Sequence, residues 1–95
     1  MKKSKHQELK QSTVVSFKKA RSLLAKIIKM VEEDAYCIDI MQQNLAVMGL
    51  LRSAHQRLME NHLKSCFQAI MTSSNQKKRN QAIEEILRVT DLFNR

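Results

Sequence analysis

Residues 35–71, AYCIDIMQQNLAVMGLLRSAHQRLMENHLKSCFQAIM, decide the fold of this chain. They contain no proline and a single glycine, Gly49, so they predict one long helix from about Ala35 to Met71. The whole chain has 95 residues with no Pro, one Gly, three Phe, one Tyr and no Trp. β-Sandwiches and barrels need turn residues and aromatic or β-branched pairs, so this composition predicts an all-α protein.

Two shorter helices are expected on either side of this long one. From Leu9 to Glu33 apolar residues recur near helical spacing among many lysines, which predicts a basic amphipathic helix. Asp34 is expected to cap the helix that follows it. Residues 1–8 are polar and expected to be disordered, residues 72–80 are expected to form a loop, and a third helix is expected over about 81–93. The sequence therefore predicts a three-helix protomer with a long central helix.

The length of the chain bounds its organisation. A single domain over residues 1–95 buries only about 60–65% of its unfolded surface, and helical hairpins of this size are often stabilised by oligomerisation. We therefore expect an oligomer. No signal peptide and no apolar run of about 20 residues is evident, so a cytoplasmic protein without a membrane span is expected.

The positive charge is confined to one part of the chain. The formal net charge is +8, and residues 1–30 carry all of it, because they hold nine Lys or Arg and one acidic residue, Glu8. A segregated basic segment is typical of a protein that binds nucleic acid or an acidic surface. A basic helix face that is simply solvated is an equally common explanation.

Three soft metal ligands lie at informative spacings on the long helix. His62 and Cys66 are four residues apart, so they share one helix face and can share a metal ion. Cys37 is 25 residues before His62, roughly 37 Å away along a straight helix at about 1.5 Å per residue. A second copy packed antiparallel would place its own position 37 beside positions 62 and 66. The spacing thus predicts two identical sites shared between two chains.

Two thiolates and one imidazole form a sulfur-rich set of three ligands that suits Cu(I). Zn(II) with a water or a fourth ligand is the competing interpretation. The alternative without a metal is that each of these residues serves packing, as a lone Cys or His on a helix usually does.

Four further soft side chains lie on the same face, within a sector of about 60° at ~100° per residue. In the antiparallel pair Met41 would approach the partner's Met59, and Met48 would approach the partner's His55. These four residues are candidate additional Cu(I) ligands. The alternative is that methionines at helical spacing are flexible core filler.

Several segments resemble the bacterial copper-sensing operon repressor family: residues 30–40 (MVEEDAYCIDI), 61–66 (NHLKSC) and 82–87 (AIEEIL). The resemblance implies that Cys37, His62 and Cys66 bind Cu(I) across a dimer interface within a disc-shaped tetramer. It also implies that Tyr36 and Glu85 link the metal to the third helix.

The chain departs from the family pattern at two sets of positions. Family repressors carry an Arg-Leu-Lys/Arg-Arg-Ile-Glu-Gly-Gln run, where residues 16–23 here read SFKKARSL. The resemblance implies that Lys18, Lys19 and Arg52 remain as DNA contacts. It also implies that Ser16 and residues 21–23 stand where the family has other DNA-binding residues, which predicts weakened operator recognition. Positions 41, 48, 55 and 59 are usually Leu, Gln, Ala and Leu in the family.

These observations predict a cytosolic Cu(I) buffer or storage protein built on a repressor-like scaffold. The alternative function is a Cu(I)-responsive transcriptional repressor that releases the operator DNA of copper-efflux genes when Cu(I) binds. An enzyme is not expected, because the sequence shows no convincing acid–base or nucleophile constellation and no glycine-rich phosphate loop.

Overall fold

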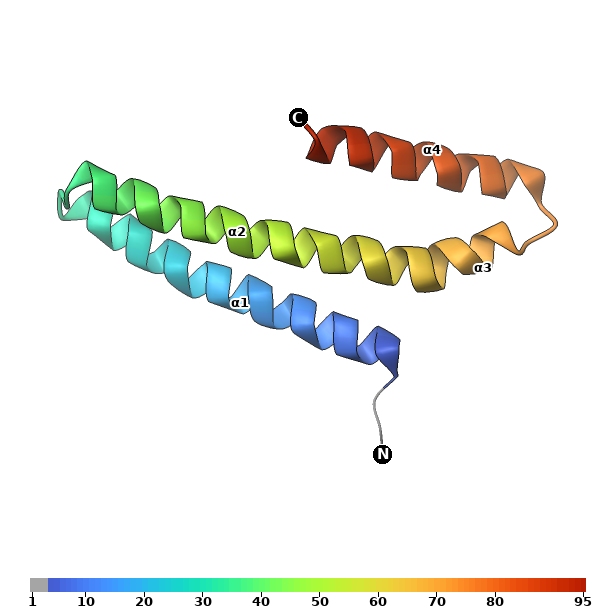
Figure 1. Cartoon of the computed structure of the whole chain (residues 1–95), viewed down its shortest axis with the longest axis horizontal. Coiled ribbons are helices and arrows are strands. Elements are labelled where there is room, and N and C mark those ends of the chain that lie inside the picture. The colour runs from blue at the N-terminus through green and yellow to red at the C-terminus, as the bar shows by residue number, and fades with distance from the viewer. Residues whose placement is uncertain (1–3) are drawn as a thin grey trace. The chain divides into compact units, whose positions relative to one another are not determined.

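The computed structural model describes residues 4–95, which form helices and no strand. The helices are α1 (Lys5–Glu32), α2 (Cys37–His62), a π-helix (Leu63–Phe67), α3 (Gln68–Met71) and α4 (Gln76–Phe93) (Figure 1). The prediction of an all-α chain is confirmed. The chain divides into two compact units, one ending at Asn61 and the other spanning His62–Arg95.

Helix α1 begins earlier than expected because Ser4 caps it. The Ser4 hydroxyl accepts a hydrogen bond from the Gln7 backbone at 3.2 Å, and the Gln7 side chain accepts one from the Ser4 backbone at 3.2 Å. This reciprocal capping box satisfies backbone donors that a helix start otherwise leaves open. The expected disorder of residues 1–8 is therefore wrong from Lys5 onward, and residues 1–3 lie outside the described part of the chain.

The junction between α1 and α2 is built around Asp34, which has a φ of 55°. The Asp34 backbone N–H donates to the carbonyl of Val31 at 3.2 Å, and that of Ala35 donates to the carbonyl of Met30 at 2.9 Å. These two bonds form a Schellman motif, which ends a helix with one residue in the left-handed region. The expectation that Asp34 caps α2 is wrong, because its backbone terminates α1 instead.

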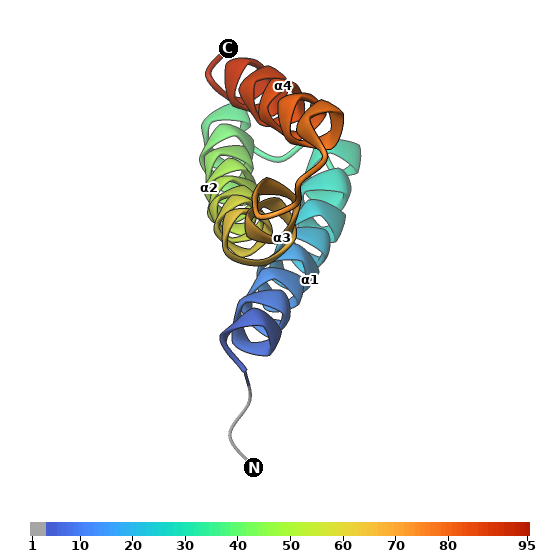
Figure 2. The same cartoon turned by 90° about the vertical axis from the view of Figure 1, so that its right-hand side faces the viewer.

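Helices α1 and α2 lie side by side and antiparallel within the first unit, as Figures 1 and 2 both show. Most of their buried and half-buried residues recur at alternating intervals of three and four, the spacing of a two-helix seam. We call this set the hairpin seam: Leu9, Thr13, Ser16, Ala20, Leu23, Ile27 and Met30 of α1, with Ile40, Gln43, Val47, Leu50, Ala54, Arg57 and Asn61 of α2.

The hairpin seam changes character along its length. Near the junction it is largely aliphatic, whereas toward the open end small and polar side chains replace the aliphatic ones. There the Arg57 guanidinium donates to the Ser16 hydroxyl at 2.6 Å, and Nδ1 of His6 lies 2.7 Å from Oδ1 of Asn61. The buried Thr13 hydroxyl donates to the carbonyl of Leu9 at 2.7 Å. Hydrogen bonds thus join the two helices where apolar side chains are fewest.

The predicted central helix is interrupted, although helical structure runs from Cys37 to Met71. The five residues Leu63–Phe67 form a π-helix between α2 and α3. The third predicted helix begins earlier than expected, at Gln76, because the Asn75 side chain accepts a hydrogen bond from the Lys78 backbone at 3.1 Å. Asn is among the preferred N-cap residues, so the expected loop over 72–80 shortens to residues 72–75.

Candidate metal and nucleic-acid sites

The first predicted metal ligand, Cys37, is the first residue of α2. Only residues 35 and 36 separate it from Asp34, the residue at the centre of the Schellman turn. Its thiol is exposed and forms no disulfide. A soft ligand therefore stands at the solvent-accessible start of the helix.

The other two predicted ligands flank the point where α2 becomes a π-helix. His62 is the last residue of α2 and is half-buried, with its ring centroid 6.2 Å from that of Phe67 and tilted by 51°. Cys66 lies in the π-helix with an exposed thiol, 3.8 Å from the hydroxyl of Ser65. A π-helix adds a residue to a helical turn and is common at functional sites. The four-residue spacing between imidazole and thiol thus spans a local change of helical register.

No three His, Cys, Asp or Glu side chains among residues 4–95 gather into a group that could hold a metal ion. Cys37 and His62 are the first and last residues of the same 26-residue helix. At about 1.5 Å per residue the helix separates them by roughly 37 Å. The structure therefore does not bring the three predicted ligands together within one chain.

The four additional soft residues lie on α2 outside the hairpin seam. Met41 is 53% exposed and Met48 is 52% exposed, while His55 and Met59 are half-buried. The centre of this group is turned roughly 135° around α2 from the hairpin seam, at ~100° per residue. Met41 and Met48 are therefore not core filler of the α1–α2 hairpin.

Tyr36 and Glu85, the pair that the family resemblance connects to the metal, both have exposed side chains. Tyr36 directly precedes Cys37 and is 68% exposed. Glu85 lies on α4 and lines an open hollow with Lys77 and Arg88 among other residues of that helix. Each belongs to a different compact unit.

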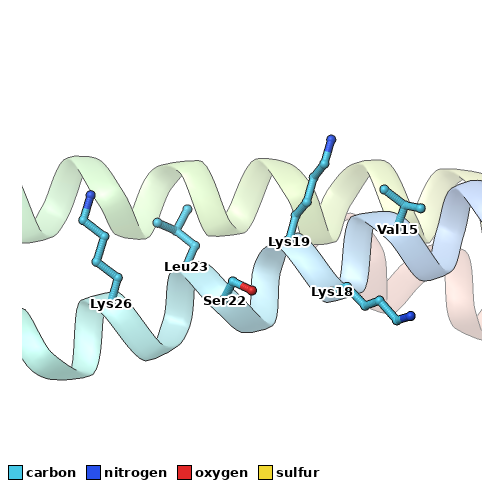
Figure 3. A pocket seen from close by; sticks show the side chains of 6 residues that line it. All are labelled: Val15, Lys18, Lys19, Ser22, Leu23 and Lys26. Atoms are coloured by element: carbon cyan, nitrogen blue, oxygen red, sulfur yellow. The ribbon is translucent and has the colours of Figure 1, made fainter.

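An open hollow on α1 gathers part of the excess positive charge. Its lining includes Lys18, Lys19 and Lys26, with Val15, Ser22 and Leu23 between them. Figure 3 shows Lys19 and Lys26 extending from the same side of α1, while Lys18 extends from the other. An adjoining hollow on the same helix shares Val15 and Lys18 and adds Lys10 to the lining.

We call Lys10, Lys18, Lys19 and Lys26 the α1 lysine strip. No Asp or Glu lines either hollow, so an anion in either one meets lysines without a competing carboxylate in its lining. The sequence prediction names Lys18 and Lys19 as candidates and does not name Lys10 and Lys26, which line the same hollows. The signal that could have found them is the absence of any acidic residue between Lys10 and Lys29. Arg52 of α2 is exposed and lies outside both hollows.

Ser16 occupies a different place from the one that the family resemblance suggests. The resemblance implies that its replacement of arginine removes a DNA-binding side chain. In the structure Ser16 is only 7% exposed and accepts the hydrogen bond from Arg57 within the hairpin seam. Position 16 therefore serves helix packing in this chain. The serine found there does not indicate whether the exposed lysines beside it can bind DNA.

None of the helices formed by the described residues is long and apolar enough to cross a lipid bilayer.

A family model described as metal-sensitive transcriptional repressor matches residues 10–92 of this chain. The match includes α2, the π-helix, α3, most of α1 and nearly all of α4.

Curated relatives point the same way. The chain is 37% identical over 78 residues to the copper-sensing transcriptional repressor CsoR of Mycobacterium ulcerans, covering 82% of this chain and 64% of the relative. It is 36% identical over 67 residues to CsoR of Bacillus subtilis, covering 70% of this chain and 63% of the relative. A 40-residue match with the copper-sensing transcriptional repressor RicR of Mycobacterium tuberculosis reaches 48% identity and covers 42% of each protein. The matches to the two CsoR proteins thus span less than two thirds of those relatives.

Proposed function

Because this chain belongs to the metal-sensitive transcriptional repressor family, we propose that it is a Cu(I)-responsive repressor that binds operator DNA without copper and releases it with copper. The observation that carries this proposal is the position of the soft ligands at opposite ends of one helix. Cys37 begins α2, while His62 ends it and Cys66 follows in the π-helix. In the proposed dimer, two α2 helices would pack antiparallel in the register that sets Cys37 of one chain beside His62 and Cys66 of the other.

The donor set suits Cu(I). Thiolates are soft ligands that select Cu(I), and an imidazole completes a three-coordinate site. Cys37 and Cys66 are exposed and form no disulfide, so their thiols are accessible to a metal. Zn(II) prefers four ligands, so it would need a water or a fourth side chain at this site.

The surface of the α1–α2 hairpin supports pairing of two chains. One flank of α2 exposes Ile38, Met41, Leu45 and Met48, each between 44% and 64% exposed. Large contiguous apolar patches on a small soluble chain mark interaction surfaces. Helix α1 also exposes aliphatic and aromatic residues one position after its seam residues: Val14, Phe17, Leu24, Ile28 and Val31. We propose that a second copy covers this apolar flank and that the dimer assembles further into a tetramer.

The DNA-binding surface in this proposal is the α1 lysine strip. Lysines that neutralise phosphates release condensed counterions, which gives affinity without base recognition. The strip contains Lys18 and Lys19, which the family resemblance implicates, together with Lys10 and Lys26. Arg52 is proposed to contribute from α2, outside the strip.

Release of DNA requires a difference in copper affinity between two states of the protein. Cu(I) can lower DNA affinity only if it binds the DNA-free state more tightly than the DNA-bound state. The π-helix beside His62, and Tyr36 and Glu85 by family resemblance, are the proposed route from the metal to the rest of the chain.

Fluorescence anisotropy with DNA from upstream of the protein's own operon tests this function. We expect saturable binding by the copper-free protein and loss of that binding when Cu(I) is added anaerobically. A scrambled DNA of equal length is the control for charge-driven association. The Cys66→Ser variant should bind the same DNA but keep it when Cu(I) is added.

Two results would contradict the proposal. Equal affinity for operator and scrambled DNA would show that the protein does not recognise the operator sequence. Unchanged DNA affinity upon Cu(I) addition would show that copper does not control DNA binding. Either result together with stoichiometric Cu(I) binding would favour the second candidate function, a Cu(I) buffer or storage protein. The names of the relatives favour the repressor over the buffer. The exposed Met41 and Met48 are the observation that keeps the buffer as the second candidate.

A further inference from the structure

The order and spacing of the candidate ligands His62 and Cys66 recur seven residues earlier in the chain. His62 and Cys66 are an imidazole and a sulfur four residues apart, and His55 and Met59 have the same order and spacing seven residues before. Seven residues correspond to two helical turns, about 10.5 Å along the axis at ~1.5 Å per residue. His55 and Met59 therefore offer a second pair of donors on the same flank of α2.

The partner helix supplies the matching donors. In the antiparallel pairing that puts Cys37 beside the partner's positions 62 and 66, a shift of one heptad puts position 44 beside the partner's 55 and 59. Position 44 is Asn, and Met41 and Met48 lie one turn before and after it. The Asn44 amide donates to Sδ of Met48 at 3.8 Å, so it holds the thioether while a second sulfur lone pair remains for a metal.

The burial pattern separates these methionines from ordinary core residues. Met30 is half-buried in the hairpin seam of the same chain, where it packs as filler. Met41 and Met48 are more than half exposed on the flank that the second copy is proposed to cover. His55 and Met59 lie at the same flank and are half-buried. Soft donors thus continue along the proposed dimer interface beyond the Cys37, His62 and Cys66 set.

We propose a second Cu(I) site in each half of the dimer, formed by His55 and Met59 of one chain with Met41 and Met48 of its partner. This inference rests on the antiparallel pairing of the proposed function. Thioethers are soft, uncharged donors that select Cu(I), and a neutral imidazole binds copper as well as zinc, so a set with three thioethers favours Cu(I) over Zn(II) and Mg(II). Because no thiolate neutralises the ion, this site holds Cu(I) more weakly than the cysteine site and fills after it.

Anaerobic Cu(I) titration of protein carrying ¹³C-methyl methionine tests the second site. The wild-type dimer should bind about two Cu(I) per chain, the first through thiolates and the second through thioethers. Methyl resonances of Met41, Met48 and Met59 should shift only during addition of the second equivalent. The His55→Ala/Met59→Leu variant should bind about one Cu(I) per chain and lose the second phase of shifts.

Met30 and Met71 provide a matched control within the same chain. The Met30→Leu/Met71→Leu variant should keep the wild-type stoichiometry, because neither residue lies on the proposed interface flank. The Cys37→Ser/Cys66→Ser variant should lose the first phase and keep the shifts of Met41, Met48 and Met59. Circular dichroism and light scattering on each variant verify helix content and dimer mass.

The outcomes separate this inference from the function on which it rests. Binding of one Cu(I) per chain with unmoved methionine methyls overturns the second site and leaves the copper-responsive repressor intact. A protein that binds no Cu(I), or stays monomeric with and without it, overturns the proposed function as well. Equal shifts of the Met30 and Met71 methyls indicate non-specific metal association and overturn the second site.

Discussion

Arg57 of α2 donates a hydrogen bond to the hydroxyl of Ser16 on α1, with the guanidinium nitrogen 2.6 Å from the oxygen. Both residues belong to the hairpin seam and are separated by 41 positions in the chain. Ser16 is 7% exposed and Arg57 is half-buried, so this bond is partly shielded from bulk water. A charged donor in such a place makes a stronger bond than a neutral one, which gives the polar half of the seam a specific alignment.

Ser16→Ala should destabilise the hairpin by about 1–2 kcal/mol, because it removes the acceptor while the Arg57 guanidinium stays partly desolvated. Urea unfolding followed by circular dichroism at a fixed protein concentration measures this change. Ser22→Ala is a matched control on an exposed position of α1. Equal stability of the Ser16 and Ser22 variants would show that the Arg57 bond contributes nothing.

Gly49→Ala should stabilise the protein by about 0.5–1 kcal/mol, since glycine costs that much relative to alanine inside a helix. A Cβ atom at position 49 would meet no heavy atom within 4 Å, so the substitution introduces no clash in one chain. The thermal unfolding midpoint of the copper-free protein should rise. A lower midpoint would reveal a neighbour of Gly49 that one chain does not contain, such as a closely packed second copy.

Asp34→Gly should raise stability by up to about 1 kcal/mol, because glycine adopts the left-handed conformation of a Schellman turn without the strain of a Cβ atom. Asp34 has a φ of 55° and the turn needs its backbone N–H, which glycine keeps. Asp34→Ala is the informative comparison, because it retains the Cβ atom. The expected order of unfolding midpoints is glycine above aspartate above alanine, and any other order speaks against strain at this turn.

Sharing of ligands between chains predicts complementation between two inactive variants. Cys37→Ser protein and Cys66→Ser protein should each lose the charge-transfer absorption of thiolate-bound Cu(I). After mixing and subunit exchange, half of the dimers are mixed and each of these regains one intact site. The absorption should therefore return to about a quarter of the wild-type value per chain. Persistent absence of the band after exchange, verified by mass, would contradict ligand sharing.

The α1 lysine strip predicts a salt-dependent contribution to DNA binding. Lys10→Ala and Lys26→Ala should each weaken binding to operator and scrambled DNA to the same degree, because lysine–phosphate pairs carry no sequence information. The slope of log affinity against log salt should fall by about 0.9 for each phosphate that the assembly no longer neutralises. Lys77→Ala on α4 serves as the control of equal charge. An unchanged slope for Lys10→Ala and Lys26→Ala would place the DNA elsewhere.

The class and number of the main helical segments were predictable from the sequence, because proline and glycine are nearly absent and the helical patterns are long. Helix ends were misplaced where side-chain capping or turn geometry decides them, as at Ser4, Asp34 and Asn75. The capping box at Ser4 is readable in principle from Gln7, three residues later. The positive φ of Asp34 has no such local signature, because most residues in that conformation are glycine.

The features of the candidate site that depend on residues close together in the sequence were predictable. Spacing on a helix is enough to propose His62 and Cys66 as a pair of ligands, which stays a prediction, and composition is enough to predict the basic first helix. Burial was not readable in the same way, since Ser16 and Ser22 look equivalent in sequence and only the hairpin seam distinguishes them. The π-helix at Leu63–Phe67 was also missed, because no residue type marks an added residue in a helical turn.

Because the composition of the hairpin seam is uneven, α1 and α2 should separate first at the end away from the Asp34 turn. Aliphatic side chains near the Asp34 turn resist separation, whereas the far end depends on a few hydrogen bonds, including that between His6 and Asn61. Local unfolding begins in the segments that bury the least apolar surface. Amide hydrogen exchange should therefore be fastest around residues 5–12 and 55–61 and slowest around 23–30 and 40–50. The start of the first helix thus separates first from the Asn61 end of its partner helix, while the turn at Asp34 still holds the two helices together.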